Sequence, residues 1–139
     1  MPDRLLFMLS KVQHRLSAHI KRELKKEGVV LSPGQIGILL VLDLDRQTTM
    51  GHLGRSLDID NAAITRLVDK LEKQNLVERR INPDDRRQML IRITEIGLAT
   101  AETVKKVAKT ANNRIKEGFT EEEIAIYKRV NLAILEKFG

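Results

Sequence analysis

The amino-acid sequence predicts a mainly α-helical protein with one small β-hairpin. Apolar residues recur at three- and four-residue steps through most of its 139 residues, which is the period of a helix. Between residues 77 and 93 the period changes to two, the period of a strand. The length suits one compact domain, and an apolar share of 42% is enough to form its core.

Composition excludes several classes of protein. The chain has no cysteine, which rules out a disulfide scaffold, a thiolate nucleophile, a cysteine-ligated zinc site and a thiol redox sensor. The longest apolar run, residues 36–42, is too short to cross a bilayer. The apolar stretch at residues 5–9 is short and no small-residue cleavage site follows it. We therefore expect a cytoplasmic protein with no membrane partner.

The first element expected is a long helix from about Asp3 to Lys26. Gly28 ends it, because glycine accepts the left-handed conformation that follows many helices. Its apolar residues form one stripe along the helix: Leu5, Leu9, Val12, Leu16, Ile20 and Leu24.

Three short helices are expected between residues 32 and 76. Ser32 and Pro33 form an N-cap and first turn, with Gln35 at the capping-box position, and this helix runs through Leu42 or beyond.

Thr49 caps the second of these helices, which ends near Leu57. Asp60 caps the third, which ends near Gln74, and Asn75 suits the left-handed turn that follows.

A hairpin then interrupts the helical pattern. Residues 77–81 and 89–93 alternate as strands do, and the turn-forming residues 82–85 lie between them in a loop of about seven residues. Two further helices follow. Thr94 and Glu95 open the first, and Thr120 with Glu123 forms a capping box for the second.

The pair of helices from Met50 to Leu71 is typical of a helix-turn-helix. Gly54 allows the second helix to cross closely, Asp58 tolerates the turn, and Ile59 fills the corner. An ordinary helical hairpin core is the alternative interpretation. The inner faces of the two helices are formed by Leu53, Leu57, Ile64, Leu67, Val68 and Leu71.

Burial of these residues predicts which side chains of the second helix point outward. Short or amide side chains near its N-terminus suit base edges, and basic ones suit phosphates. The alternative is a solvated face, which Asp69 and Glu72 favour. The candidate DNA-binding residues on this face are Asn61, Ala62, Thr65, Arg66 and Lys70.

The arginine-rich hairpin favours the DNA-binding interpretation. A helix-turn-helix followed by such a ribbon is a winged helix, whose tip can place arginine near the negative potential of the minor groove. Asp85 is expected to brace Arg87 there by a charge-assisted hydrogen bond. A surface turn with incidental arginines is the alternative. The hairpin carries Arg79, Arg80, Arg86, Arg87 and Arg92.

Because they contain these motifs, residues from about Leu31 to Gly97 resemble the core of the MarR family of transcription regulators. The resemblance extends to the flanking helices. The combination of the Asp-Arg-Arg wing with the Ile-Thr-x-x-Gly step is more specific than either motif alone. The matching segments are Thr49–Leu57, Ile64–Glu72, Leu76–Arg79, Asp85–Arg87 and Ile93–Gly97.

The resemblance implies a homodimer that binds pseudo-palindromic double-stranded DNA, most simply as a repressor. Residues 1–30 and 95–139 would form a helical dimerisation region, and residues 31–94 the winged lobe. By this match Asp85, Arg86 and Arg87 belong to the wing, and Ser32 and Gln35 lie at a helix start that touches the DNA backbone. The long apolar stripes of the end helices independently favour a dimer, because a small monomer would leave them exposed.

The resemblance also implies release by a small phenolic or other anionic aromatic effector, bound between the dimer helices and the lobe. Two departures from the family pattern bear on DNA contact. Ala62 and Ala63 replace the hydroxyl residues common early in the recognition helix, although alanine can pack on a thymine methyl group. Asn75 replaces the usual glycine.

Other functional classes receive less support. The sequence shows no nucleophile–base constellation, no glycine-rich phosphate loop and no metal-ligand pattern around its three histidines, so we expect no enzyme, cofactor or metal site. A net charge of +6 is compatible with nucleic acid but is spread along the chain. A helical interaction or anti-repressor protein that keeps this fold without binding DNA is therefore the open alternative.

Overall fold

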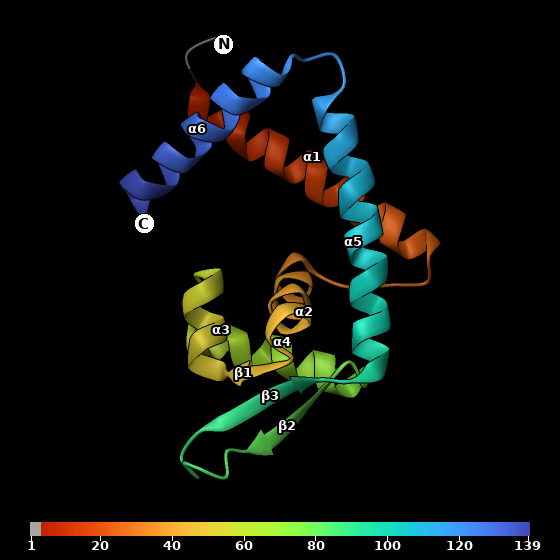
Figure 1. The fold of residues 1–139 in the computed structure, drawn as a ribbon, viewed down its shortest axis with the longest axis vertical. Helices are drawn as coiled ribbons and strands as arrows, with labels where there is room; N and C mark the ends of the chain where they lie inside the picture. Colours follow the sequence, from red (N-terminus) through yellow and green to blue (C-terminus); the bar gives the residue numbers. More distant parts are fainter. Residues whose placement is uncertain (1–3) are drawn as a thin grey trace. The chain divides into compact units, whose positions relative to one another are not determined.

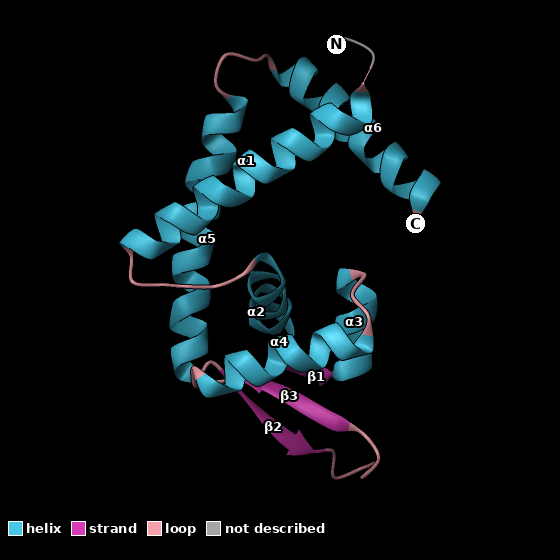
Figure 2. Cartoon of the chain, turned by 180° about the vertical axis from the view of Figure 1, so that it is seen from behind, coloured by secondary structure: helices cyan, strands magenta, loops and turns pink. Residues whose placement is uncertain are grey.

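The computed structural model describes residues 4–139 and shows a helical protein with one small sheet (Figures 1 and 2). Two compact units divide at residues 107 and 108, within one long helix. The expected fold class is confirmed. The elements in chain order are α1 (Leu5–Lys26), α2 (Pro33–Asp45), β1 (Gln47–Thr49), α3 (Met50–Leu57), α4 (Asn61–Lys73), β2 (Val77–Ile81), β3 (Met89–Ile93), α5 (Glu95–Lys116) and α6 (Glu121–Phe138).

The predicted helix ends agree with the structure. Helix α1 begins at Leu5, and the expected start at Asp3 lies outside the described residues. Gly28 follows it with φ +76°. Helix α2 has the full capping box, in which the Ser32 hydroxyl accepts from the Gln35 amide and the Gln35 side chain accepts from the Ser32 amide. Asn75 takes the left-handed conformation, with φ 60°.

The sheet contains one more strand than the sequence predicted. The hairpin of β2 and β3 has the expected loop of residues 82–88, but β1 pairs with the other edge of β3 and gives the order β1-β3-β2. All pairs are antiparallel, with Thr48 opposite Ile91 and Arg79 opposite Ile91 from the other side. The wing is therefore attached through β3 to the chain segment that enters α3.

The core of residues 1–107 lies among α2, α3, α4 and the sheet. Leu24 from α1 and Val104 from α5 also contribute to it. Lys105 of α5 places its ammonium 2.9 Å from the Asp43 carboxylate of α2. Hydrogen bonds to Glu102 and Asp43 raise the pKa of Lys105. The side chains that are fully buried include Ile38, Leu39, Leu42, Leu53, Ile64, Val68, Leu71 and Ile91.

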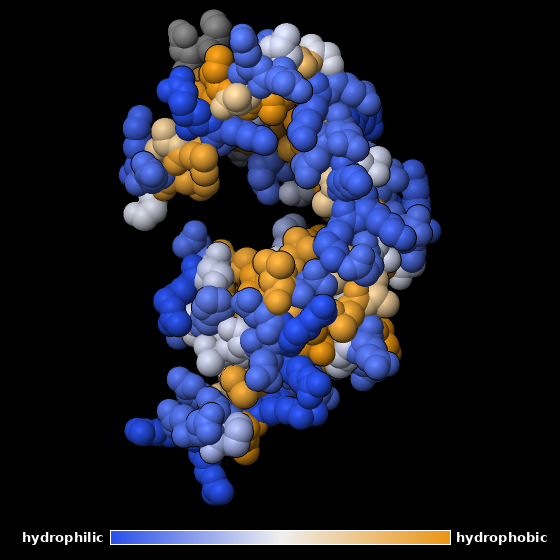
Figure 3. Space-filling model, in the orientation of Figure 1, coloured by the Kyte–Doolittle hydropathy of each residue, from blue (hydrophilic) through white to orange (hydrophobic). Residues whose placement is uncertain are grey.

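Residues 108–139 hold the end of α5 and all of α6. Thr120 caps α6 with the predicted capping box to Glu123, and Gly118 in the preceding turn has φ +83°. Helix α6 contains no buried residue. Its exposed apolar side chains colour part of its surface orange in Figure 3. No helix among residues 4–139 is both long and apolar enough to span a membrane.

Candidate nucleic-acid interface

Helices α3 and α4 form a helix-turn-helix around a tight, three-residue connection. Asp58 ends α3 in the left-handed conformation, with φ 53°, and the Ile59 amide donates to the Gly54 carbonyl at 3.0 Å. A Cβ atom on Gly54 would lie 2.9 Å from the Ile59 carbonyl oxygen and 3.8 Å from Ile64. The close approach predicted at Gly54 is therefore present, and the turn itself makes the tightest contact.

Helix α4 buries one face and exposes the other. Asp60 caps its N-terminus, accepting from the Ala63 amide at 2.8 Å, and Ile64, Val68 and Leu71 face the core. This arrangement leaves the opposite face open to a partner. All five predicted DNA-binding residues of this helix are exposed: Asn61, Ala62, Thr65, Arg66 and Lys70.

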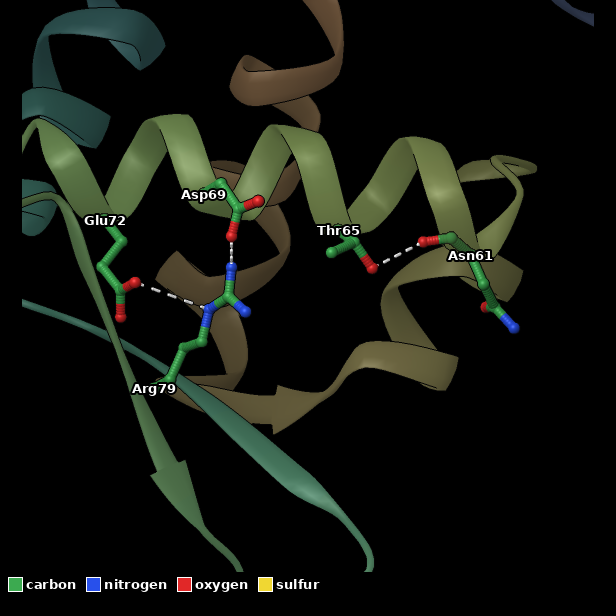
Figure 4. A network of polar contacts seen from close by, with 5 residues as sticks. All are labelled: Asn61, Thr65, Asp69, Glu72 and Arg79. Atoms are coloured by element: carbon green, nitrogen blue, oxygen red, sulfur yellow. Dashed lines mark hydrogen bonds and ion pairs between the residues drawn. The ribbon is translucent and has the colours of Figure 1, made fainter.

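The exposed side chains at the start of α4 differ in what they can offer a base. The Thr65 hydroxyl donates to the Asn61 carbonyl at 2.8 Å (Figure 4). Its hydrogen is thus used inside the helix, so Thr65 can offer a methyl group and an acceptor but not a donor. The Asn61 side-chain amide is exposed and extends away from the helix in the same view.

The wing tip is ordered by short-range hydrogen bonds. The Asp85 carboxylate accepts from the Arg87 backbone amide at 3.0 Å, and Asn82 accepts from the Asp84 amide at 3.0 Å. The Arg87 side chain is 95% exposed, with its Nε 3.6 Å from Asp85 Oδ1. Asp85 therefore braces the backbone rather than making the expected hydrogen bond to the guanidinium. The neighbouring Arg86 is also exposed.

One wing arginine is turned toward α4 instead of solvent. Arg79 of β2 donates to the Asp69 carboxylate, and its Nε lies 3.6 Å from Glu72 Oε1 (Figure 4). In the sequence, Asp69 and Glu72 favoured a solvated face over a DNA-binding one, and in the structure both carboxylates are paired with Arg79. The pairing crosses from helix to strand, so helical spacing gave no sign of it.

The predicted DNA-backbone residues at the start of α2 have different environments. Ser32 is half-buried as the N-cap, whereas Gln35 is only 6% exposed. The Gln35 side chain accepts from the Ser32 amide at 2.8 Å and donates to Gln74 at 3.2 Å, and Gln74 donates to the Val30 carbonyl at 3.3 Å. Phosphate contact by Gln35 remains a prediction, but its side chain is already used to join α2 to the end of α4. Sequence reasoning missed the role of Gln74.

Together, a helix-turn-helix with an exposed α4 face and an adjoining basic hairpin define a winged helix-turn-helix protein.

Comparison with known proteins supports this class of protein. Residues 31–89 match the model of the MarR family. The chain is 30% identical over 95 residues to the transcriptional regulator MhqR of Bacillus subtilis, covering 68% of this chain and 64% of that protein. It is 25% identical to the transcriptional repressor IacR of Pseudomonas putida, covering 89% and 73% of the two chains.

Solved structures show the same fold. A probable transcriptional regulator from Pseudomonas aeruginosa superposes with a TM-score of 0.84 at 25% identity, covering 95% of this chain and 97% of that one. A mutant MarR from E. coli in complex with operator DNA superposes with a TM-score of 0.86 at 22% identity, covering 96% and 94%. The chain belongs to the MarR family of transcriptional regulators, with residues 31–89 as the part that the family model covers.

Proposed function

We propose that this protein is a sequence-specific DNA-binding repressor that acts as a homodimer on a pseudo-palindromic operator. One observation carries the proposal. The outward face of α4 is exposed, and it lies in the same lobe as a wing whose Arg87 side chain is 95% exposed. In a protein of this size, such a combination of free polar and basic groups suits a groove and its phosphates.

Each exposed residue has a chemical role in this proposal. Asn61, Thr65 and Arg66 lie on the part of α4 that enters the major groove, where amide and guanidinium groups distinguish base edges. Lys70 binds phosphate from the same face. Arg87 places a guanidinium at the minor groove, assisted by Arg86.

The dimer is supported by apolar surface that neither unit buries. In α1, Leu5 is 71% exposed and Leu6 83%, and in α6, Leu135 is 67% exposed and Phe138 85%. Removing apolar surface from water is worth about 25 cal/mol per Å². A second copy of the chain is the partner that also supplies a second lobe, and two lobes must reach major grooves roughly 34–36 Å apart.

A binding titration with genomic DNA fragments at two salt concentrations tests DNA recognition. We expect affinity to fall as salt rises, because phosphate contacts release condensed counterions. Sequencing of the selected fragments should then reveal an inverted repeat. Absence of binding at both salt concentrations would favour the alternative, a helical interaction or anti-repressor protein, to which Ala62 and Ala63 lend some support.

A cavity beside α1 supports the proposed control by a small anionic aromatic effector. It has a volume of about 510 Å³ and is lined by residues of α1, of the segment before α2 and of the start of α2, including His14, Lys21, Leu31 and Ile36. Cationic and apolar lining together suit a carboxylate on a ring. Calorimetry with 4-hydroxybenzoate and its neutral amide, on the wild type and Lys21→Met, tests this site. Equal binding of acid and amide would argue against it.

A further inference from the structure

Arg79, at the middle of β2, connects the wing to the C-terminal half of α4. It lies opposite the buried Ile91 in the β2–β3 pairing, three residues before the wing loop begins at Asn82. Its guanidinium donates to Asp69, and its side chain is only 24% exposed. The contact therefore joins α4 to the strand that leads directly to the wing tip.

The contact between Arg79 and Asp69 leaves one buried polar atom, Arg79 Nε, without a hydrogen bond in the described part of the chain. The Nε of Arg79 is buried and has no hydrogen-bond partner among residues 4–139, although Glu72 Oε1 lies 3.6 Å away. A buried donor without a partner is costly, and such groups in native proteins call for a reason. The position of Arg79 thus leaves its Nε without a hydrogen bond to any described residue, while its guanidinium joins the wing to α4 through Asp69.

The neighbouring ion pair on the same strand provides a contrast. Arg80 pairs with Glu78 at 2.9 Å, but both belong to β2 and their side chains are 56% and 45% exposed. That pair joins nothing beyond its own strand, and exposed pairs of this kind contribute little. The chain therefore contains a matched control for the contact between Arg79 and Asp69.

We propose that Arg79, Asp69 and Glu72 form a positioning cluster that fixes the angle of the wing against α4, so that the contribution of Arg87 to DNA binding depends on it. The inference rests on the proposed DNA-binding function. None of the three residues needs to touch DNA. Their effect passes through β2 to the tip.

Substitution of Asp69 separates this proposal from a purely electrostatic role, because the two predict opposite signs. If Asp69 acted only as a negative charge near DNA, Asp69→Ala would tighten DNA binding. It would remove the repulsion of the phosphates and leave the Arg79 guanidinium without its partner Asp69. If Asp69 positions the wing, Asp69→Ala weakens binding even though the protein becomes more positive.

A double-mutant cycle completes the test, using the fragment selected by the wild type. Arg87→Ala alone should weaken binding about tenfold. In the Asp69→Ala background we expect the same change to weaken it less than about threefold, since a displaced wing no longer places Arg87. In the control background, Glu78→Ala, the tenfold effect should persist.

Circular dichroism and thermal melting must show that each variant is folded. If Asp69→Ala fails to fold, Asp69→Asn and Glu72→Gln replace it in the same cycle. Additive effects of Asp69→Ala and Arg87→Ala, or tighter binding by Asp69→Ala, would overturn the positioning role while leaving DNA binding intact. Failure of the wild type to bind DNA would instead remove the proposed function on which the inference depends.

Discussion

The winged lobe and the C-terminal unit use the same kind of amphipathic sequence in opposite ways. In α2, Ile38, Leu39 and Leu42 are fully buried against other elements of the same chain. In α6 no residue is buried, and Phe138 is 85% exposed. An apolar stripe thus fixes which face of a helix is covered, but not whether the cover comes from the same chain.

The largest effect is expected from removing the C-terminal segment, residues 120–139. If α6 covers a second copy, its loss should raise the dimer dissociation constant by at least about a hundredfold, because burying even two large apolar side chains contributes about 3–6 kcal/mol. Sedimentation at several protein concentrations measures this. The lobe should retain its helical signal, because its core lies in residues 1–107. A truncated protein that remained a tight dimer would contradict this use of α6.

Matched glycine substitutions should affect the two regions unequally. A Cβ atom on Gly97 would lie 2.1 Å from the Leu76 carbonyl oxygen, whereas one on Gly118 would meet nothing within 4 Å. We expect Gly97→Ala to lower the free energy of unfolding by about 3 kcal/mol. Gly118→Ala should lower it by only about 1 kcal/mol, the cost of a left-handed alanine. Urea unfolding compares the two, and equal losses would show that the lobe is no more tightly packed than the α5–α6 turn.

Substitution of Arg87 tests whether the wing of the lobe contacts DNA as proposed. Arg87→Ala should weaken operator binding by about 1–3 kcal/mol without changing dimerisation or folding. Fluorescence anisotropy with labelled operator measures the loss, and Arg114→Ala, an exposed change in the last turn of α5, serves as control. Unchanged affinity for Arg87→Ala would remove the wing tip from the interface.

The smallest effect is expected at Thr65. Because its hydroxyl already donates to the Asn61 carbonyl, Thr65→Val retains the methyl surface and should change operator affinity by less than about 0.5 kcal/mol. Thr65→Ala removes that surface and should alter affinity or base preference. Selection of bound sequences by each variant checks both. A loss with valine as large as that with alanine would show that the hydroxyl oxygen accepts a hydrogen bond from DNA.

Local signals in the sequence predicted most of the fold. The caps at Ser32, Thr49 and Thr120, the turn residue Asp58 and the hairpin each depend on a few adjacent residues, whose preferences are strong. Strand β1 escaped prediction because three residues are too few to show a period. Its approach also depends on Arg46, which takes φ 67° and accepts from the Ile93 amide at 3.0 Å.

The candidate site was predicted less completely than the fold. The exposed face of α4 follows from helical period alone, so its five residues could be named. Burial of Gln35 and the turning of Arg79 toward α4 arise from partners far along the chain, Gln74 and Asp69. No local pattern marks such partners, and only the packed structure brings them together.

The junction before α5 ties the start of that helix to the end of α4. The Thr94 hydroxyl donates to the Asn75 carbonyl at 2.7 Å and accepts from the Gly97 amide at 3.0 Å, and Gly97 packs on Leu76. The first turn of α5 is thereby joined directly to the segment that leaves α4. We therefore expect a rotation of the start of α5 to move the end of α4 with it.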